Sequence, residues 1–489
     1  MKKIFKKSIV SVLAAALALT AFTACAPDAD TGTKYDGETV ILLSDSKITA
    51  DGKKVGSSGD IFVSNDVIYY EDRDTYDSGN RYGEGTDKDK HTAEEAASVT
   101  VVNIAKAGIY RLSGKLSNGQ IRIDLGEDAY EDETAVVTLV LDGLDINCDV
   151  APAVVFMNVY ECDGDWSAET AKMDVDTSAA GANVVIADGS INNIEGAYVA
   201  KIFKDNDKEK KLWKQDGAFY SYMSMNIDGE EEGNGVLNIT ADNEGLCAEL
   251  HLSINGGNIN IVSQDDGINT NEDGVSVTAI NGGNLRIISG MGAEGGDGID
   301  SNGWIVANGG TTVSVAYQMT DSGIDNDNGF YANGGTVISY GSYVDWAEPD
   351  SRQTTLNLQF KEDISTEDAV VITDKNGNVV FCYDASEDET IGRYICDRVG
   401  VTISSPQLKA GECCSLYIGG DVEGSEYYGI YDVNTVKNFK DAVQQVQHSS
   451  EVFYHGGFQY DSSKVYTPTT DFNLDQTVNC FALITDITD

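Results

Sequence analysis

Proline and cationic side chains are scarce in this sequence. Only 5 of the 489 residues are proline, and 33 Lys and Arg stand against 80 Asp and Glu, which gives a formal net charge of −47. A chain this acidic repels nucleic acid and anionic membrane surfaces, so a nucleic-acid partner is not expected. The same charge suits high solubility or the binding of divalent cations.

Cysteine motifs are missing as well. None of the nine cysteines forms a Cys-x-x-Cys motif or stands at zinc-binding distance from a histidine, which argues against the common zinc-binding motifs. The pairs nearest in sequence, Cys148 with Cys162 and Cys382 with Cys396, are candidates for disulfide bonds in an exported protein. Free thiols are the alternative.

Long hydrophobic runs are absent except at the N-terminus. Residues 1–24 have a basic start and a short apolar stretch, too short to span a bilayer and typical of a secretory signal peptide. The leader ends Phe22-Thr23-Ala24-Cys25, similar to the bacterial lipoprotein cleavage box with Phe22 in place of the usual leucine. We therefore expect a lipid anchor on Cys25, a tether over 25–38 and a place on the extracellular face of the cell membrane, which the protein contacts only through the anchor. An ordinary signal peptide with an incidental cysteine is the alternative.

What the sequence does contain is a repeat. Asn-Gly-Gly begins at Asn255, Asn281, Asn308 and Asn333, in steps of 26, 27 and 25 residues. A period in the twenties is typical of a solenoid. Apolar and polar residues alternate after each phrase, and a repeat of this length accommodates three short strands and three turns. Each repeat is therefore predicted to be one coil of a parallel β-helix.

A second phrase, Gly-Ile followed by Asn or Asp, recurs at Gly267, Gly298 and Gly323. If these glycines occupy the same corner of successive coils, the residues around them stack in columns. The isoleucines of the phrase are expected to form a ladder in the core: Ile268, Ile299 and Ile324. Ten Asp and Asn side chains are predicted to share one outward strip: Asp265, Asp266, Asn269, Asn271, Asp297, Asp300, Asn302, Asp321, Asp325 and Asp327.

This strip is predicted to bind Ca²⁺. Adjacent coils are spaced by about 4.8 Å, and two carboxylates about 5 Å apart repel by roughly 3 kcal/mol at an effective dielectric constant near 20. Calcium takes about six to eight oxygens at about 2.3 to 2.6 Å, so two ligands across one ion lie about 4.6 to 5.2 Å apart, which matches the coil spacing better than magnesium would. The alternative is that these side chains only serve turns and asparagine ladders. That explains the Asn-Gly-Gly asparagines better than it explains Asp300, Asp325 and Asp327.

The fold class is predicted to be all-β. The solenoid is expected over 39–345, with insertions near 70–97 and 201–214. The repeat stops after Tyr343, so we expect a small C-terminal β unit over 354–420, followed by an extension over 421–489 with a short helix near Val436 to Gln447.

Several stretches resemble one family. Gly108-Ile109-Tyr110-Arg111-Leu112-Ser113-Gly114, Leu141-Asp142-Gly143-Leu144-Asp145-Ile146 and Asp265-Asp266-Gly267-Ile268 are similar to bacterial carbohydrate-binding-domain-containing β-helix lipoproteins, which resemble the family 9 polysaccharide lyases in fold. The resemblance covers roughly 99–420, with the insertions as departures. It implies a right-handed parallel β-helix, bound calcium and carbohydrate binding with no known catalytic need.

The expected function is therefore calcium-dependent binding of a plant cell-wall or acidic (uronate) polysaccharide, pectin-like or cellulosic, without catalysis and with no assigned catalytic residue. A calcium-dependent lyase of the pectate-lyase type is one alternative, but it needs a Lys or Arg base near the ion. Between Gln215 and Phe360 there is no lysine, and the only cations are Arg286, Arg352 and a protonated His251. Arg286 is expected on a different side of the coil from the strip. A glycosidase with paired carboxylates and a structural adhesin stiffened by calcium are further alternatives.

Aromatic side chains near the repeats are candidates for stacking on sugar rings or for filling the core: Trp304, Phe330, Tyr331, Tyr343 and Trp346. Trp304 and Phe330 fall where apolar strand residues are expected.

The leader makes a prediction that does not depend on the fold. Mass spectrometry of the native N-terminus should find a lipid-modified Cys25 as the first residue, in a mature chain whose formal charge is −51 because the leader carries four lysines and no acid. An unmodified mature chain that begins elsewhere contradicts the anchor.

Overall fold

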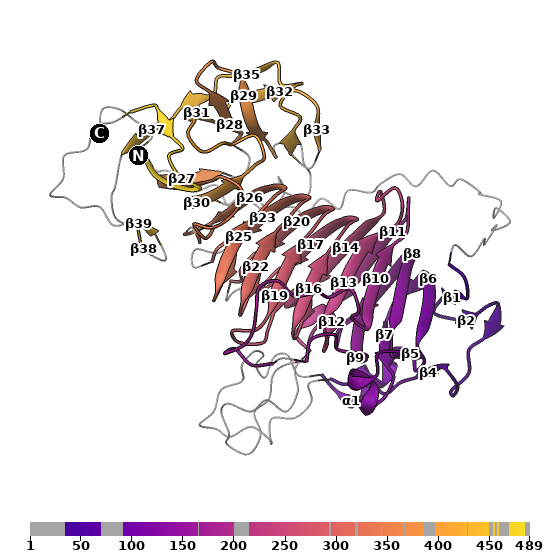
Figure 1. Cartoon of the computed structure of the whole chain (residues 1–489). Helices are drawn as coiled ribbons and strands as arrows, with labels where there is room; N and C mark the ends of the chain where they lie inside the picture. Colours follow the sequence, from indigo (N-terminus) through magenta and orange to yellow (C-terminus); the bar gives the residue numbers. More distant parts are fainter. Residues whose placement is uncertain are drawn as a thin grey trace, which may run out of the picture.

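In the computed structural model of the chain, long parallel sheets run through most of the molecule (Figure 1). The structure describes residues 35–69, 91–164, 166–199, 215–292, 295–317, 321–343, 345–365, 368–385, 397–427, 429–448, 453–454, 457–458 and 469–484. The all-β architecture is as predicted, and its coil-by-coil pairing is consistent with a parallel β-helix.

Three strands are found in each repeat, and each strand pairs in parallel with its counterpart in the next repeat. We call the resulting sheets the first, second and third sheet. The first sheet comprises β4 (Ile61–Ser64), β5 (Thr100–Ile104), β7 (Gly119–Asp124), β9 (Val154–Asn158), β12 (Gly217–Ser221), β15 (Glu244–Ala248), β18 (Ile268–Thr270), β21 (Ile299–Ser301) and β24 (Asp325–Asn326). Its pairs are parallel except that β4 runs antiparallel to β5.

The second and third sheets share the long strand β8 (Val137–Cys148), which pairs with β10 through one half and with β11 through the other. The second sheet continues through β10 (Ala182–Ile186), β13 (Met225–Gly229), β16 (His251–Ile254), β19 (Val277–Ile280), β22 (Trp304–Ala307) and β25 (Gly329–Ala332). The third sheet continues through β11 (Ile191–Gly196), β14 (Val236–Ala241), β17 (Asn258–Ser263), β20 (Asn284–Ser289), β23 (Thr311–Ala316) and β26 (Thr336–Gly341).

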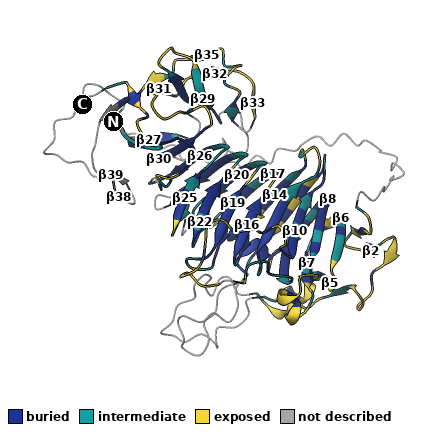
Figure 2. Ribbon diagram, viewed as in Figure 1, coloured by how far each residue is buried: buried dark blue, intermediate teal, exposed yellow. Residues whose placement is uncertain are grey.

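The core lies between these sheets, where the predicted isoleucine ladder is found. Ile268 pairs with Ile299 across β18 and β21, and both belong, with Ile324, to one continuous cluster of buried side chains. Figure 2 shows that the strands of the long sheets are mostly buried. Each of the three is at most 1% exposed. The alternation of inward apolar and outward polar residues on short strands therefore predicts this core correctly.

The Asn-Gly-Gly phrases form the corners between the second and third sheets. The second glycine of each has a positive φ, 82° at Gly257 and 75° at Gly283, a conformation that side-chain-bearing residues rarely adopt. A Cβ on Gly283 would also lie 2.5 Å from the carbonyl oxygen of Gly257 in the preceding coil. Glycine is required here by both conformation and close packing between coils.

Asparagine side chains join these corners into a ladder, as the turn-and-ladder alternative predicted for them. The Nδ2 of Asn281 donates to the Oδ1 of Asn255 over 2.9 Å, Asn308 donates to Asn281 over 2.9 Å, and Asn333 donates to Asn308 over 3.3 Å. We call these four residues the asparagine ladder.

Further elements lie at the N-terminal end of the three sheets. These are β1 (Thr39–Leu43), β2 (Thr49–Ala50), β3 (Lys53–Lys54), β6 (Gly108–Leu116), the helix α1 (Ala93–Ser98) and the 3₁₀ helix η1 (Glu127–Glu131). Thr92 and Glu95 form a capping box at the start of α1. The predicted leader, most of the tether, Cys25, most of the insertion near 70–97 and the insertion at 201–214 lie outside the described residues.

A second unit packs on the last coils. Its strands are β27 (Thr355–Ser365), β28 (Val370–Asp374), β29 (Val379–Tyr383), β30 (Asp397–Ser404), β31 (Cys413–Ile418), β32 (Asp421–Glu423), β33 (Glu426–Tyr427), β34 (Ile430–Tyr431), β35 (Asn438–Lys440), β36 (Val443–Gln444), β37 (Val446–His448), β38 (Phe453–Tyr454), β39 (Gly457–Phe458), β40 (Phe472–Asn473) and β41 (Val478–Ile484). β30 pairs antiparallel with β26, which joins this unit to the third sheet. A second core cluster includes Val313 and Ile338 of the third sheet together with Leu356 and Phe381.

One local expectation was wrong. The helix predicted near Val436 to Gln447 is replaced by β35, β36 and the start of β37, because pairing with β32, β31 and β41 outweighs the local helical pattern. For the cysteines, the free-thiol alternative holds where the structure describes them. Cys148 and Cys162, a candidate pair, form no disulfide bond, and neither does Cys382, whose candidate partner Cys396 is not described. No helix within the described residues has the length and hydrophobicity needed to cross a membrane.

The isoleucine ladder gives a stability prediction. Ile299→Ala should lower the free energy of unfolding by about 2 to 5 kcal/mol, because it leaves a cavity between coils. Ile191→Ala is the matched control, since that side chain is 62% exposed and its loss should cost less than about 0.5 kcal/mol. Urea unfolding followed by circular dichroism measures both, and equal effects of the two substitutions contradict the packing.

Candidate functional site

The predicted carboxylate columns lie on the outward side of the first sheet. Strand register places Asn269 beside Asp300, and Asp300 beside Asp325, on β18, β21 and β24. These three residues follow the buried isoleucines, so alternation along each strand turns them away from the core. The first of the predicted columns is therefore present.

A second column lies at the corner that precedes these strands. Glu244 and Asp266 each stand two residues before the paired Leu246 and Ile268, and Asp297 stands two residues before Ile299. The backbone N–H of Asp297 donates to the Oδ1 of Asp266 over 2.6 Å, and the N–H of Ser322 donates to the Oδ1 of Asp297 over 2.5 Å. The backbone of the following coil thus holds the carboxylates of Asp266 and Asp297 in place.

Asn269 links the two columns. Its Nδ2 donates to the Oε1 of Glu244 and to the Oδ2 of Asp266, both over 3.0 Å. Its Oδ1 is buried and has no hydrogen-bond partner within the described part of the chain. We use the name acidic strip for the two columns and the carboxylates that adjoin them: Glu244, Asp265, Asp266, Asn269, Asp297, Asp300, Asp321, Asp325 and Asp345.

Burial and mutual repulsion raise the pKa of several of these carboxyl groups. Burial is the largest cause for Asp266, whose pKa lies well above its usual range, and the charges of Asp265, Asp300, Glu244 and Asp297 add to it. Burial followed by the charge of Asp325 raises the pKa of Asp297 to about 8, against the lowering effect of the Ser322 hydrogen bond.

Two further residues reach the strip from the segment after β26. Burial and the charge of Asp325 raise the pKa of Asp345 to about 7. The Oδ2 of Asp345 accepts a hydrogen bond from the Nδ2 of Asn326 over 2.6 Å. The pKa of Tyr343 is raised by burial and by Asp297, Asp325, Asp345 and Asp321. The strip thus crowds carboxyl groups, among them protonated ones near neutral pH, beside a phenol that is protonated as well.

The remaining predicted residues form a column of their own. Asn271, Asn302 and Asp327 follow β18, β21 and β24, and their backbone N–H groups continue the pairing between coils. The Nδ2 of Asn302 donates to the Asn271 carbonyl and to Asp273, both over 2.8 Å. These contacts fit a turn-stabilising role. This column therefore fits the alternative in which the Asp and Asn side chains serve turns and ladders and do not bind a metal ion.

Glu244 and Asp345 belong to the acidic strip, but the repeated phrases did not predict either residue. Glu244 precedes Gly245 in a degraded copy of the repeated phrase, so extending the register by one coil would have found it. Asp345 lies beyond the last repeat, where no periodic signal exists.

A small cluster of possible metal ligands adjoins the strip. Asp216, Glu244 and Cys247 are all buried and bring ligand atoms within 4.8 Å of one another. The Cys247 thiol donates to the Oε2 of Glu244 over 2.7 Å.

The acidic strip fits a hard divalent cation. Its donors are carboxylate and amide oxygens, the ligands that calcium prefers. The buried Oδ1 of Asn269 is an acceptor that still needs a donor or a cation. No Lys or Arg occurs in the sequence from Gln215 to Phe360 other than Arg286 and Arg352. Arg286 lies on β20 of the third sheet, a different side of the coil as predicted.

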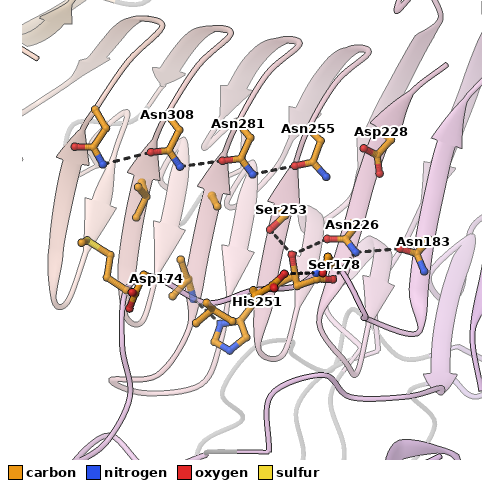
Figure 3. Close-up of a pocket in the computed structure, with 18 of the residues that line it drawn as sticks. Asp174, Ser178, Asn183, Asn226, Asp228, His251, Ser253, Asn255, Asn281 and Asn308 are labelled. Atoms are coloured by element: carbon orange, nitrogen blue, oxygen red, sulfur yellow. Dashed lines mark hydrogen bonds between the residues drawn. The ribbon is translucent and has the colours of Figure 1, made fainter. Parts of the chain in front are cut away.

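A hollow lies on another face, over the outward side of the second sheet, and encloses about 530 Å³. Figure 3 shows the asparagine ladder along one edge, with Asp228 continuing the row, and Ser253, Asn226 and Asn183 on the floor. No sequence pattern pointed to this hollow, because the segment that forms its other wall, from Met173 to Ser178, belongs to no repeat.

Of the aromatic candidates, Phe330 is in the core and Trp304 is not. Phe330 pairs with the inward Ile305 and is 1% exposed. Trp304 pairs with Val277, which lines the hollow, and it is half-buried on the outward side of the second sheet. Tyr331 lies outward beside Val306.

The sequence of this chain matches one family of known proteins. A sequence profile described as "Carbohydrate-binding domain-containing protein" matches residues 98–164 and 166–389. The chain belongs to this family. A carbohydrate-binding domain-containing protein of Acetivibrio thermocellus is 30% identical over 181 residues, which are 36% of this chain and 51% of that protein, so the chain spans about half the length of this curated relative.

A solved structure titled polysaccharide lyase-like protein from C. thermocellum, gadolinium derivative, is also similar to the chain. It has a TM-score of 0.33 and 19% sequence identity, with 61% of this chain and 92% of that chain covered.

The raised pKa of Asp297 gives a pH prediction for the protein in chelator. In the folded state this pKa is about 8, whereas an unfolded chain has about 3.9. Between these values the folded protein holds a proton that the unfolded chain has lost, so stability should fall as the pH rises through this window. Thermal unfolding at several pH values from 5 to 8 measures the slope.

Asp297→Asn should reduce that slope, because the amide does not titrate, while Asp421→Asn at an exposed site of β32 should keep it. A wild-type melting temperature that does not fall with pH contradicts the prediction, as does an unchanged slope in Asp297→Asn.

Proposed function

We propose that this protein binds carbohydrate without catalysis, and that calcium in the acidic strip takes part in binding a uronate-containing polysaccharide such as pectin. The observation that carries the proposal is the stack of buried and half-buried carboxylates in the strip, beside the unpartnered Oδ1 of Asn269. The stretch of sequence that supplies them has no lysine, and its arginines, Arg286 and Arg352, lie on the third sheet and at the hollow over the second sheet. Membership of a carbohydrate-binding family supplies the ligand class.

The residues best placed to hold the ion are Asp266 and Asp297 at the corner and Asp300 and Asp325 on the strands, with the Oδ1 of Asn269. Calcium at this position would offset the like-charge repulsion and offer a coordination position to a uronate carboxylate. Without it, a chain of formal charge −47 repels an acidic polysaccharide.

The lyase alternative lacks a base in the described part of the strip. Arg286 lies on the third sheet and Arg352 lines the hollow over the second sheet. Burial lowers the pKa of His251 against the opposing charges of Glu161 and Asp163, so this side chain does not supply a cation. A purely structural role for calcium is the other alternative, and it is favoured if the ion binds and no polysaccharide does.

Two further proposals, on the handedness of the coils and on the lipid anchor, rest on the family resemblance and on the leader. The solenoid is proposed to wind right-handed, and the protein is proposed to stand on the extracellular face of the cell membrane through a lipid on Cys25.

Asp300→Ala tests the strip. Its side chain is outward and half-buried, so the fold should survive, and calcium affinity and polygalacturonate binding should both fall at least about ten-fold. Calorimetry with calcium, and then with polygalacturonate in calcium or chelator, measures both. Asp421→Ala, at an exposed site of the C-terminal unit, is the control.

Wild-type protein that binds no calcium, or that binds polygalacturonate equally well in chelator, contradicts the proposal. Polygalacturonate incubated with the protein should show no rise in ultraviolet absorbance from unsaturated uronate, and a calcium-dependent rise supports the lyase alternative.

A further inference from the structure

The floor of the hollow over the second sheet is built from outward side chains that the register places in one line. Asn183 pairs with Asn226, Asn226 with Ser253, Ser253 with Ala279, and Ala279 with Val306. These side chains are short in the middle of the line, at Ser253 and Ala279, which makes the surface concave. From β10 to β25 the line crosses six strands, so it extends over roughly 24 Å at about 4.8 Å per strand.

One wall is the asparagine ladder. A carboxamide has two N–H donors and an oxygen with two lone pairs, and the ladder uses one donor and one lone pair of each inner residue. Asn255, Asn281 and Asn308 are exposed at the edge of the hollow. The wall therefore presents a further donor and acceptor at every coil.

The other wall is the segment from Met173 to Ser178, which hydrogen bonds hold against the floor. The Oγ1 of Thr177 donates to the Oδ1 of Asn226 over 2.7 Å and lies 2.7 Å from the Oγ of Ser253. The Nδ2 of Asn226 donates to the Thr177 carbonyl over 2.8 Å and to Asn183 over 3.0 Å. Because these bonds are buried, the wall is fixed before any ligand arrives.

The chemistry of the lining suits an uncharged polymer of sugars. Asp174, Asp176 and Asp228 outnumber the single cation Arg352, so a polyanion is disfavoured. Amide and hydroxyl groups match sugar hydroxyls, which both donate and accept hydrogen bonds. Val277 and Val306 also line the hollow and add small apolar contacts, because they are only 3% and 5% exposed.

Aromatic side chains extend the same surface toward its C-terminal end. Trp304 follows Val277 in one outward column, and Tyr331 follows Val306 in the next. Both are half-buried, so each holds its ring partly open to solvent. Aromatic rings in such positions supply contact area at low entropic cost.

We propose that this hollow is a second carbohydrate-binding surface, separate from the acidic strip, and that it holds an extended strand of neutral polysaccharide along the axis of the solenoid. The inference rests on the proposed carbohydrate-binding function and assigns it a surface and a ligand class that need no calcium. The two surfaces lie on different sheets, so one protein contacts an acidic and a neutral polymer through different faces.

Ala279→Trp tests the surface by filling the middle of the floor. The full-length protein is titrated in calcium with cellohexaose, xylohexaose, mannohexaose and hexagalacturonate. At least one neutral oligosaccharide should bind the wild type, and Ala279→Trp should weaken that binding at least about ten-fold while calcium affinity and the melting temperature stay at wild-type values. Thr240→Trp, at an exposed position on β14 of the third sheet, is the matched control and should bind normally.

The outcomes separate this inference from the proposed function. If calcium and hexagalacturonate fail to bind while a neutral oligosaccharide binds and is lost in Ala279→Trp, the strip proposal fails and the hollow stands. If no neutral oligosaccharide binds the wild type, or if Ala279→Trp binds as well as Thr240→Trp, the hollow is not a binding surface.

Discussion

Parallel pairing of successive coils in register is the constraint on which the rest of this structure depends. It places the same position of every repeat in one column at about the spacing of paired strands, roughly 4.8 Å. The chemistry of a column is then decided by the residue type repeated in it. Isoleucine columns build the core, asparagine columns build a hydrogen-bonded ladder, and aspartate columns build a strip of concentrated charge.

The amide and acidic columns respond to this constraint in opposite ways. An asparagine donates to the asparagine of one neighbouring coil and accepts from that of the other, so neighbouring side chains in the ladder attract each other. A carboxylate only accepts, and its neighbours repel it. Asp266 and Asp297 use backbone N–H groups and Asn269 as partial compensation, yet their pKa values stay raised. A cation is the simplest completion of the acidic strip, whereas the asparagine ladder needs none.

Much of the repeat could be predicted from the sequence because its signals are local and periodic. The Asn-Gly-Gly phrases give the corners, and alternation gives the inward Ile268 and Ile299 and the outward Asp300 and Asp325. The order of the repeated phrases also indicated the carbohydrate-binding family to which the chain belongs. Phe330 was correctly expected in the core, but Trp304, grouped with it, faces outward because the residue before Ile305 points away from the core.

The features that were missed depend on contacts without a period. Asp345 reaches the acidic strip from a segment after the last coil, and Thr177 reaches the second sheet from a connection that no repeat announces. Strand pairing across the C-terminal unit replaced the helix expected near Val436. Proximity in sequence could not decide between a disulfide bond and free thiols for Cys148 and Cys162, and both are thiols in the structure, with Cys148 at the end of β8.

The release of protons on calcium binding tests the central claim most directly. If calcium enters the acidic strip at pH 7, it must displace protons from carboxyl groups whose pKa lies at or above that pH, including Asp297 with its pKa of about 8. Calorimetric titration in two buffers of different ionisation enthalpy measures the number of protons released per ion. The account predicts a release of about one proton or more at pH 7 that declines toward pH 9. Calcium binding with no proton release at pH 7, or no binding at all, contradicts it.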